Sequence, residues 1–233
     1  MPPIDVARAF LWFAAFLFST TVHEALHAWA ALRGGDPTAH RGGQVSLSPV
    51  PHVRREPIGM LVVPLLTALT QGWAIGWAST PYDPIWAARY PRRAALMAAA
   101  GPAGNLLIAI SAFLLIKAGL LAGLFVAPSS VNLSHLVETA TKGATFAGEA
   151  LSVLLVLNVF LCVFNLIPLP PLDGGSVITL ILPPRAADTM REMGHQPLFQ
   201  MAGLLIAWRV FPLVTGPLFM LILRAVHPHD AYS

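Results

Sequence analysis

Residues 7–32 read ARAFLWFAAFLFSTTVHEALHAWAAL, and this stretch decides the fold class. As a helix it is about 39 Å long at about 1.5 Å per residue, which exceeds the roughly 30 Å hydrocarbon core of a bilayer. Its ionisable residues are Arg8 near the start and His23, Glu24 and His27 in one short group. We therefore predict a membrane-spanning helix that carries a compact cluster of polar chemistry.

This polar cluster, His23-Glu24-Ala25-Leu26-His27, has the H-E-x-x-H spacing. Side chains at i and i+4 share one helical face with Cβ atoms about 5–6 Å apart, so both imidazoles can bind one Zn²⁺. Glu24 is adjacent and can act as a general base on a water at the metal. Such a short pattern also arises by chance. Ionisable groups inside a membrane segment are costly, however, and mark function by default, so we favour a zinc site.

Composition agrees with a polytopic membrane protein. The 233 residues are 56% hydrophobic and 11% charged, against about 25% charged in soluble domains, and the mean hydropathy is +0.68. We expect one intramembrane domain over residues 1–233, with no cleaved signal peptide. The single cysteine, Cys162, excludes an internal disulfide, and the net charge of +3 gives no reason to expect a nucleic-acid partner.

Apolar segments recur along the chain. They cover residues 7–32, 58–78, 94–116, 146–167 and 198–226. We predict an all-α polytopic fold with about four to six transmembrane helices and a short re-entrant or β-hairpin element between the first and second full spans. The run 58–70 contains Pro64 and is too short to span, so we expect 58–78 to enter the membrane and return. Alternation at 44–47 predicts a short strand, and residues 183–197 read as a polar loop.

The placement of positive residues tests the re-entrant prediction. If residues 58–78 do not cross, one side holds nine positive residues and the other side holds four. The nine are Arg33, Arg41, Arg54, Arg55, Arg89, Arg92, Arg93, Arg185 and Arg191, and the four are Arg8, Lys117, Lys142 and Arg224. A full crossing makes the split nearly even. The positive-inside rule therefore favours the re-entrant arrangement, with the nine residues in the cytoplasm.

A hydrolytic zinc needs a third protein ligand, and Asp173 is the strongest candidate. It lies at the end of an apolar segment within the Pro- and Gly-rich stretch 168–175, where the backbone can bend toward a site. The alternative is that Asp173 caps a following helix. In the re-entrant arrangement, segments 7–32 and 146–167 run in the same direction. His23, His27 and Asp173 then lie at similar depth.

Taken together, these residues resemble the site-2 protease family, the intramembrane zinc metalloproteases of the M50 type. Four motifs within residues 10–180 carry the resemblance: HEALH at 23–27, GDPTA at 35–39, GPAGN at 101–105 and NLIPLPPLDG at 165–174. It implies that His23, His27 and Asp173 bind one zinc, with Glu24 as general base. It also implies that peptide bonds are cut within the membrane. No PDZ-like or cystathionine-β-synthase-like region is visible, so we expect a minimal form, with residues 198–226 as a C-terminal helical segment.

Three asparagines and an extended segment have open roles. Asn105 either stabilises an oxyanion or substrate carbonyl as a catalytic residue, or forms an interhelical hydrogen bond. Asn165 is a candidate to orient a metal ligand, and Asn158 is expected to join helices. A substrate must be extended at the site, and residues 44–47 or 72–78 can pair with it by strand addition or merely cover the cavity.

The sequence thus predicts a zinc metalloendopeptidase that hydrolyses membrane-embedded proteins or peptides. It is expected to lie among lipids in a bacterial-type inner or plasma membrane, with the active site toward the cytoplasmic half. One alternative is a non-proteolytic zinc-binding partner or assembly factor with the same fold. Another is a metal transporter, but an ion path should place ligands at several depths, whereas these ligands gather in one cluster.

Overall fold

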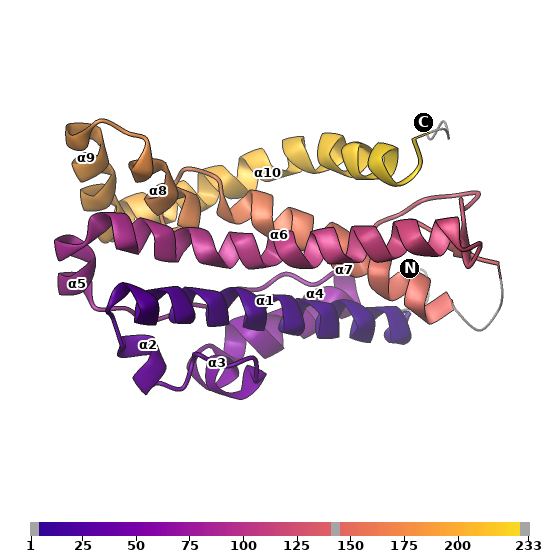
Figure 1. Cartoon of the computed structure of the whole chain (residues 1–233), viewed down its shortest axis with the longest axis horizontal. Coiled ribbons are helices and arrows are strands. Elements are labelled where there is room, and N and C mark those ends of the chain that lie inside the picture. Colours follow the sequence, from indigo (N-terminus) through magenta and orange to yellow (C-terminus); the bar gives the residue numbers. More distant parts are fainter. Residues whose placement is uncertain (1–4, 141–144, 229–233) are drawn as a thin grey trace.

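The computed structural model describes residues 5–140 and 145–228, so Lys142 lies outside the described residues. Its long helices run roughly along one common direction (Figure 1). Within the described residues, four helices are long and apolar enough to cross a membrane: α1 (Val6–Gly34), α6 (Pro91–Leu121), α7 (Thr145–Asn165) and α10 (Pro197–Val226). They match the predicted spans to within a few residues, so the all-α polytopic fold class is confirmed.

The start of α6 lies beside the end of α1. Trp86 Nε1, on α5 (Pro84–Arg89), donates a hydrogen bond of 3.0 Å to Gly34 O, and Arg93 Nη1 donates one of 3.0 Å to the same carbonyl. The chain between α1 and α6 therefore leaves and returns at one end of the molecule, as Figure 1 shows. As predicted, the segment between these two helices does not run from one end of the molecule to the other.

The re-entrant segment is a short helix followed by extended chain. The π-helix η1 (Ile58–Val62, 5 residues) continues into α4 (Val63–Gln71, 9 residues), and together they extend about 21 Å, less than the hydrocarbon core. Gly72 ends α4 with φ of 79°, a conformation that residues with a Cβ rarely adopt. Residues 72–83, which we call the return limb, then run back without regular structure.

Two groups on the helical half of the segment (η1 and α4) hydrogen-bond to the return limb. Thr67 Oγ1 accepts a 2.9 Å hydrogen bond from Ile75 N, and Gly59 O accepts a 3.1 Å bond from Trp77 N. One edge of the limb's backbone is therefore hydrogen-bonded to the helical part of the segment, and irregular chain at membrane depth needs such partners.

The strand predicted at residues 44–47 is wrong. Gln44 N donates a 3.0 Å hydrogen bond to Ala39 O on α2 (Thr38–Arg41), and bends follow until α3 (Pro49–Arg55) begins. The alternation of polar and apolar residues therefore belongs to a turn that bonds to α2, and within the described residues it pairs with no strand. The sheet found in the described residues is instead β1 (Phe125–Val126) paired antiparallel with β2 (Glu138–Thr139), between α6 and α7.

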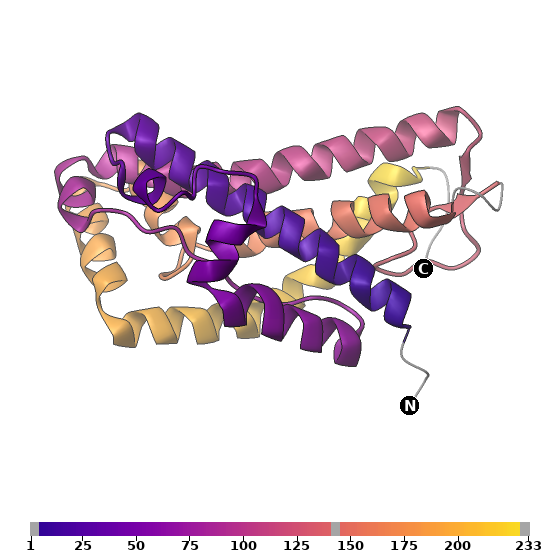
Figure 2. The same cartoon turned by 90° about the horizontal axis from the view of Figure 1, so that it is seen from below.

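The predicted polar loop at 183–197 is also wrong, because most of it is helical. After α8 (Asp173–Val177) and the 3-10 helix η3 (Ile178–Leu180), α9 (Pro184–His195) begins with proline at its first position. That position tolerates proline, and residues 185–193 contain no helix breaker. The last helix, α10, continues through Pro212 and Pro217, although it changes direction along its length (Figure 2).

The packed body consists of α1, α6 and α7. Trp12 and Phe16 of α1, Ile116 of α6, and Val153 and Val156 of α7 are all buried in one apolar cluster. In contrast, 11% of the most apolar window of α10 is buried, against 56% for α1. The site described next lies within the packed body, and α10 mostly faces the surroundings.

Candidate metal centre

Helix α1 carries His23, Glu24 and His27, all buried at 6%, 4% and 6% exposure. The two histidines stand one turn apart, and their Nε2 atoms are 2.9 Å from each other. At about 1.5 Å per residue they lie roughly 26 and 32 Å from Val6, so they are inside the candidate span and nearer its C-terminal end.

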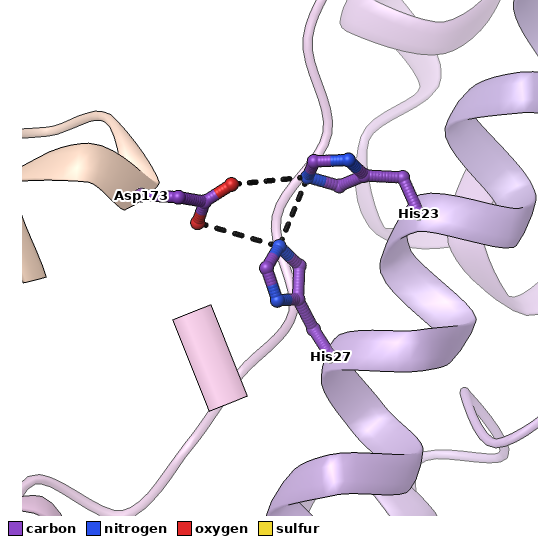
Figure 3. A group of neighbouring side chains, drawn as sticks. All are labelled: His23, His27 and Asp173. Carbon is purple, nitrogen blue, oxygen red and sulfur yellow. Dashed lines mark hydrogen bonds and ion pairs between the residues drawn. The ribbon is translucent and has the colours of Figure 1, made fainter. Parts of the chain in front are cut away.

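Asp173 is distant from the two histidines in sequence but contacts both of them. Its Oδ2 lies 3.2 Å from His23 Nε2 and its Oδ1 lies 3.3 Å from His27 Nε2 (Figure 3). The helix α7 ends at Asn165, and a series of turns including Leu172 N to Leu169 O (3.0 Å) leads to Asp173. The prolines in this stretch prevent α7 from continuing past the depth of the histidines.

Asp173 does not take the alternative role of a helix N-cap. Asp173 is the first residue of α8, the N-cap residue is Leu172, and no side-chain capping bond is formed. The carboxylate instead points at the imidazoles (Figure 3). The fold therefore brings His23, His27 and Asp173 together, although His27 and Asp173 are 146 positions apart.

Backbone and side-chain acceptors orient both imidazoles. His27 Nδ1 donates to Met97 O at 2.8 Å, because a carbonyl oxygen can only accept. His23 Nδ1 lies 2.6 Å from Asn105 Oδ1. The amide of Asn105 is oriented in turn by a 2.8 Å bond from its Nδ2 to Asn158 Oδ1. In the neutral rings, protonation at Nδ1 leaves a lone pair on each Nε2, the atom that faces the partner histidine and Asp173.

This donor set suits a metal ion. Two Nε2 lone pairs and a carboxylate repel one another unless a cation or a proton lies among them, and their ligand atoms lie within 4.8 Å of one another. Asp173 Oδ2 is shielded from solvent and makes no hydrogen bond within the described residues. Two histidines with one carboxylate is a donor set found in hydrolytic zinc sites.

Gly101 on α6 leaves open the volume in front of the two histidine Nε2 atoms. A Cβ at this position would overlap with Nε2 of both His23 and His27. Any side chain larger than hydrogen would therefore occupy the volume in front of the two ligand nitrogens. The backbone of α6 approaches α1 closely here, as small residues allow in membrane helix packing.

Thr80 of the return limb contacts Glu24. Thr80 Oγ1 lies 2.7 Å from Glu24 Oε2 and 3.0 Å from Glu24 O. Within the described residues, the side-chain hydrogen bond of the Glu24 carboxylate is accepted by Oε2. The other oxygen, Oε1, belongs to a carboxylate that lies next to the two histidines in sequence.

Asn105 lies between two other polar side chains in the packed body. Its exposure is 0%, its Oδ1 faces His23, and its Nδ2 donates to Asn158. The Asn105 oxygen and one of its N–H groups are thus occupied by side chains of two other helices, and these contacts favour the interhelical hydrogen bond over the oxyanion role. Asn158 also donates to Ser19 Oγ of α1 at 2.8 Å, which joins three helices as expected of this residue.

Asn165 was expected to orient a ligand, but its Nδ2 donates to Leu161 O of its own helix at 2.9 Å. The sequence interpretation also missed the contacts of Met97 O, Gly101 and Thr80. A carbonyl has no sequence signature, whereas Gly101 belongs to the GPAGN motif and gave a usable signal.

The model of peptidase family M50 matches residues 11–208, which include all the residues of this centre. The chain belongs to peptidase family M50. It is also 31% identical over 179 residues to the "Putative zinc metalloprotease YwhC" of Bacillus subtilis (strain 168), which covers 76% of this chain and 72% of that protein. No solved structure matches the chain. The resemblance to the site-2 protease family is therefore confirmed.

Membership in family M50 and the four apolar helices support a metallopeptidase that is an integral membrane protein. The three-residue centre lies in the part of the chain that the family model covers.

Proposed function

We propose that this M50 peptidase is an intramembrane zinc metalloprotease that hydrolyses peptide bonds of membrane-embedded proteins. The observation that carries the proposal is the convergence of His23 Nε2, His27 Nε2 and the Asp173 carboxylate beside Glu24, inside an apolar helix long enough to span a bilayer. In this proposal the three residues hold one Zn²⁺ per chain, and residues 1–233 act as a single domain.

The residues of the candidate centre have defined tasks in the proposed reaction. A zinc ion, when bound, supplies Lewis acidity toward water and the scissile carbonyl. Glu24 accepts the proton of the attacking water at Oε1 and delivers it to the leaving amine. Asn105 and Met97 O keep the two imidazoles in the tautomer that presents Nε2.

The substrate backbone must be extended to be cut, because the carbonyls of a helix are already hydrogen-bonded. The return limb is suited to receive it by strand addition. Ile75 N and Trp77 N bond to the helical half, whereas the alternate N–H groups of Gly76 and Ala78 have no partner within the described residues. In extended chain, alternate N–H groups point to opposite sides, so these two form an open edge.

We place the centre in the cytoplasmic half of a bacterial-type inner or plasma membrane. The histidines lie nearer the end of α1 that joins the Arg-rich segments, and Arg93 contacts Gly34 at that end. By the positive-inside rule this end faces the cytoplasm. The partners are then a transmembrane protein or peptide and the surrounding lipid.

The test is cleavage of a set of single-span membrane peptides by the purified full chain in detergent, compared with Glu24→Gln, with zinc measured on both proteins. We expect zinc in both and cleavage by the unmodified protein alone. Zinc in both without cleavage of any peptide would support the alternative, a non-proteolytic zinc-binding partner. Loss of zinc from Glu24→Gln would make Glu24 a structural part of the metal site.

A further inference from the structure

We propose that Thr80 is a positioning residue for Glu24, an inference that rests on the proposed function. The hydroxyl Oγ1 lies 2.7 Å from Glu24 Oε2, and the two residues are 56 positions apart. The contact joins the return limb to the carboxylate next to the two histidines.

The return limb delivers Thr80 to this place by running along one face of α1. A Cβ at Gly76 would lie 2.7 Å from Phe16 Cζ, so the limb touches α1 at Phe16 and again at Glu24. Eight helical residues rise about 12 Å, and four extended residues span about 13 Å. Residues 16–24 of α1 and residues 76–80 of the limb therefore cover similar distances. Thr20 stands between Phe16 and Glu24 on the same face of α1.

The limb is anchored before it reaches Glu24. Ile75 N donates to Thr67 Oγ1 at 2.9 Å, and Trp77 N donates to Gly59 O at 3.1 Å. Thr80 follows these anchors by only a few residues. Its hydroxyl is therefore fixed by the re-entrant segment, and it can in turn fix the side chain that it contacts.

The hydroxyl of Thr80 has one proton and two acceptors within reach. The carboxyl Oε2 at 2.7 Å is nearer than the Glu24 carbonyl oxygen at 3.0 Å, so we take Oε2 as the acceptor of this proton. Donation to Oε2 restrains the glutamate rotamer, which otherwise has several rotatable bonds. It also leaves Oε1 as the oxygen that exchanges protons. Catalytic groups must be held within about 0.5 Å of the productive geometry, so loss of this restraint should slow the chemical step.

The experiment compares Thr80→Val, Thr80→Ser and the matched control Thr70→Val in the full chain in detergent. Thr70 is exposed, and within the described residues its hydroxyl donates to Leu66 O of its own helix. For each protein we measure zinc content, thermal unfolding midpoint, and kcat and KM on a peptide that the unmodified protein cleaves. Thr80→Val should lower kcat about ten- to a hundredfold, the range for a hydrogen bond to a charged group. KM, zinc and midpoint should stay unchanged, and Thr80→Ser should restore kcat.

A second measurement does not depend on cleavage. Infrared carboxylate bands of Glu24 are identified as those absent from Glu24→Gln, and Thr80→Val should shift them while Thr80→Ser and Thr70→Val should not. An unchanged kcat or unshifted bands in Thr80→Val would overturn the inference. So would loss of zinc or a lowered midpoint, which would make Thr80 structural. If no peptide is cleaved by the unmodified protein, the proposed function fails, and the infrared bands still decide the contact.

Discussion

His23 Nδ1 and Asn105 Oδ1 lie 2.6 Å apart, although the residues are 82 positions apart in the chain. The contact joins α1 to α6, and the bond from Asn105 Nδ2 to Asn158 Oδ1 extends it to α7. A side chain that binds a metal through Nε2 needs its other nitrogen held by an acceptor. The packing of three membrane helices therefore sets the orientation of one imidazole of the candidate centre.

Replacing Asn105 by Leu should weaken zinc binding. Leucine keeps the approximate volume but removes the acceptor for His23 Nδ1, and loss of such a partner costs about ten- to a hundredfold in metal affinity. Titration of the purified protein with a zinc chelator measures this effect.

The companion variant is Asn105→Asp, which keeps an acceptor oxygen at the same position. It should hold zinc more tightly than Asn105→Leu does. If the leucine variant keeps the affinity of the unmodified protein, Asn105 does not orient His23, and its role is limited to joining helices.

Replacing Gly101 by Ala should abolish zinc binding while leaving the helices intact. The added Cβ would overlap with Nε2 of His23 and of His27, the atoms that face the candidate metal position. Alanine favours helix over glycine, so the substitution should not unfold α6. Zinc content and circular dichroism of the purified variant measure the two effects.

Gly216→Ala is the matched control, because a Cβ at Gly216 on α10 meets nothing within 4 Å. It should keep both zinc and cleavage. Full zinc occupancy in Gly101→Ala would mean that α6 withdraws from α1, and that Gly101 does not define the volume of the centre.

The spans and the residues of the candidate centre could be predicted from the sequence for physical reasons. Long apolar runs have few alternatives in a membrane, and the i, i+4 spacing of His23 and His27 holds in any helix. Asp173 could be proposed because a carboxylate at the end of an apolar segment has a solvation cost that needs a partner. These inferences use local properties of the chain.

The parts that failed depend on partners distant in sequence. Alternation at residues 44–47 is the same for a strand and for a turn packed on α2, and only a pairing strand distinguishes them. The low hydropathy of 183–197 could not separate a polar helix from a loop. The buried surroundings of Asn105 and the contact of Thr80 with Glu24 follow from helix packing, which no spacing in the sequence expresses.

Asp36 should stabilise the fold near neutral pH and lose this effect in acid. Its Oδ1 accepts from Thr38 N at 2.9 Å and its Oδ2 accepts from Asp83 N at 2.8 Å, which ties the end of α1 to the return limb. Burial alone would raise the pKa of Asp36, but hydrogen bonds from Thr38 and Asp83 outweigh it and lower the pKa below the ordinary 3.8. A carboxyl with a depressed folded-state pKa stabilises above the unfolded pKa, and the effect is lost as pH falls through the folded value.

Asp36→Asn should therefore lower the thermal unfolding midpoint at about pH 7, by the equivalent of roughly 1–3 kcal/mol, and the difference should shrink toward about pH 3. Asp188→Asn serves as control, because Asp188 is 68% exposed and its pair with Arg191 is at the surface. Equal midpoints for Asp36→Asn and the unmodified protein at neutral pH would show that the loop is held without this carboxylate.

Replacing Ala78 by Pro tests whether the return limb receives the substrate. Proline removes the N–H of residue 78, which has no partner within the described residues, and favours the extended conformation at Trp77. The limb's own anchors at Ile75 and Trp77 are untouched, so zinc content should stay unchanged while peptide cleavage falls severalfold or more, chiefly through a higher KM. Ala78→Val is the matched control, since it adds bulk but keeps the N–H, and it should cleave better than the proline variant. If Ala78→Pro cleaves as well as Ala78→Val, the substrate does not pair with this edge, and the limb serves only to cover Glu24 and the histidines.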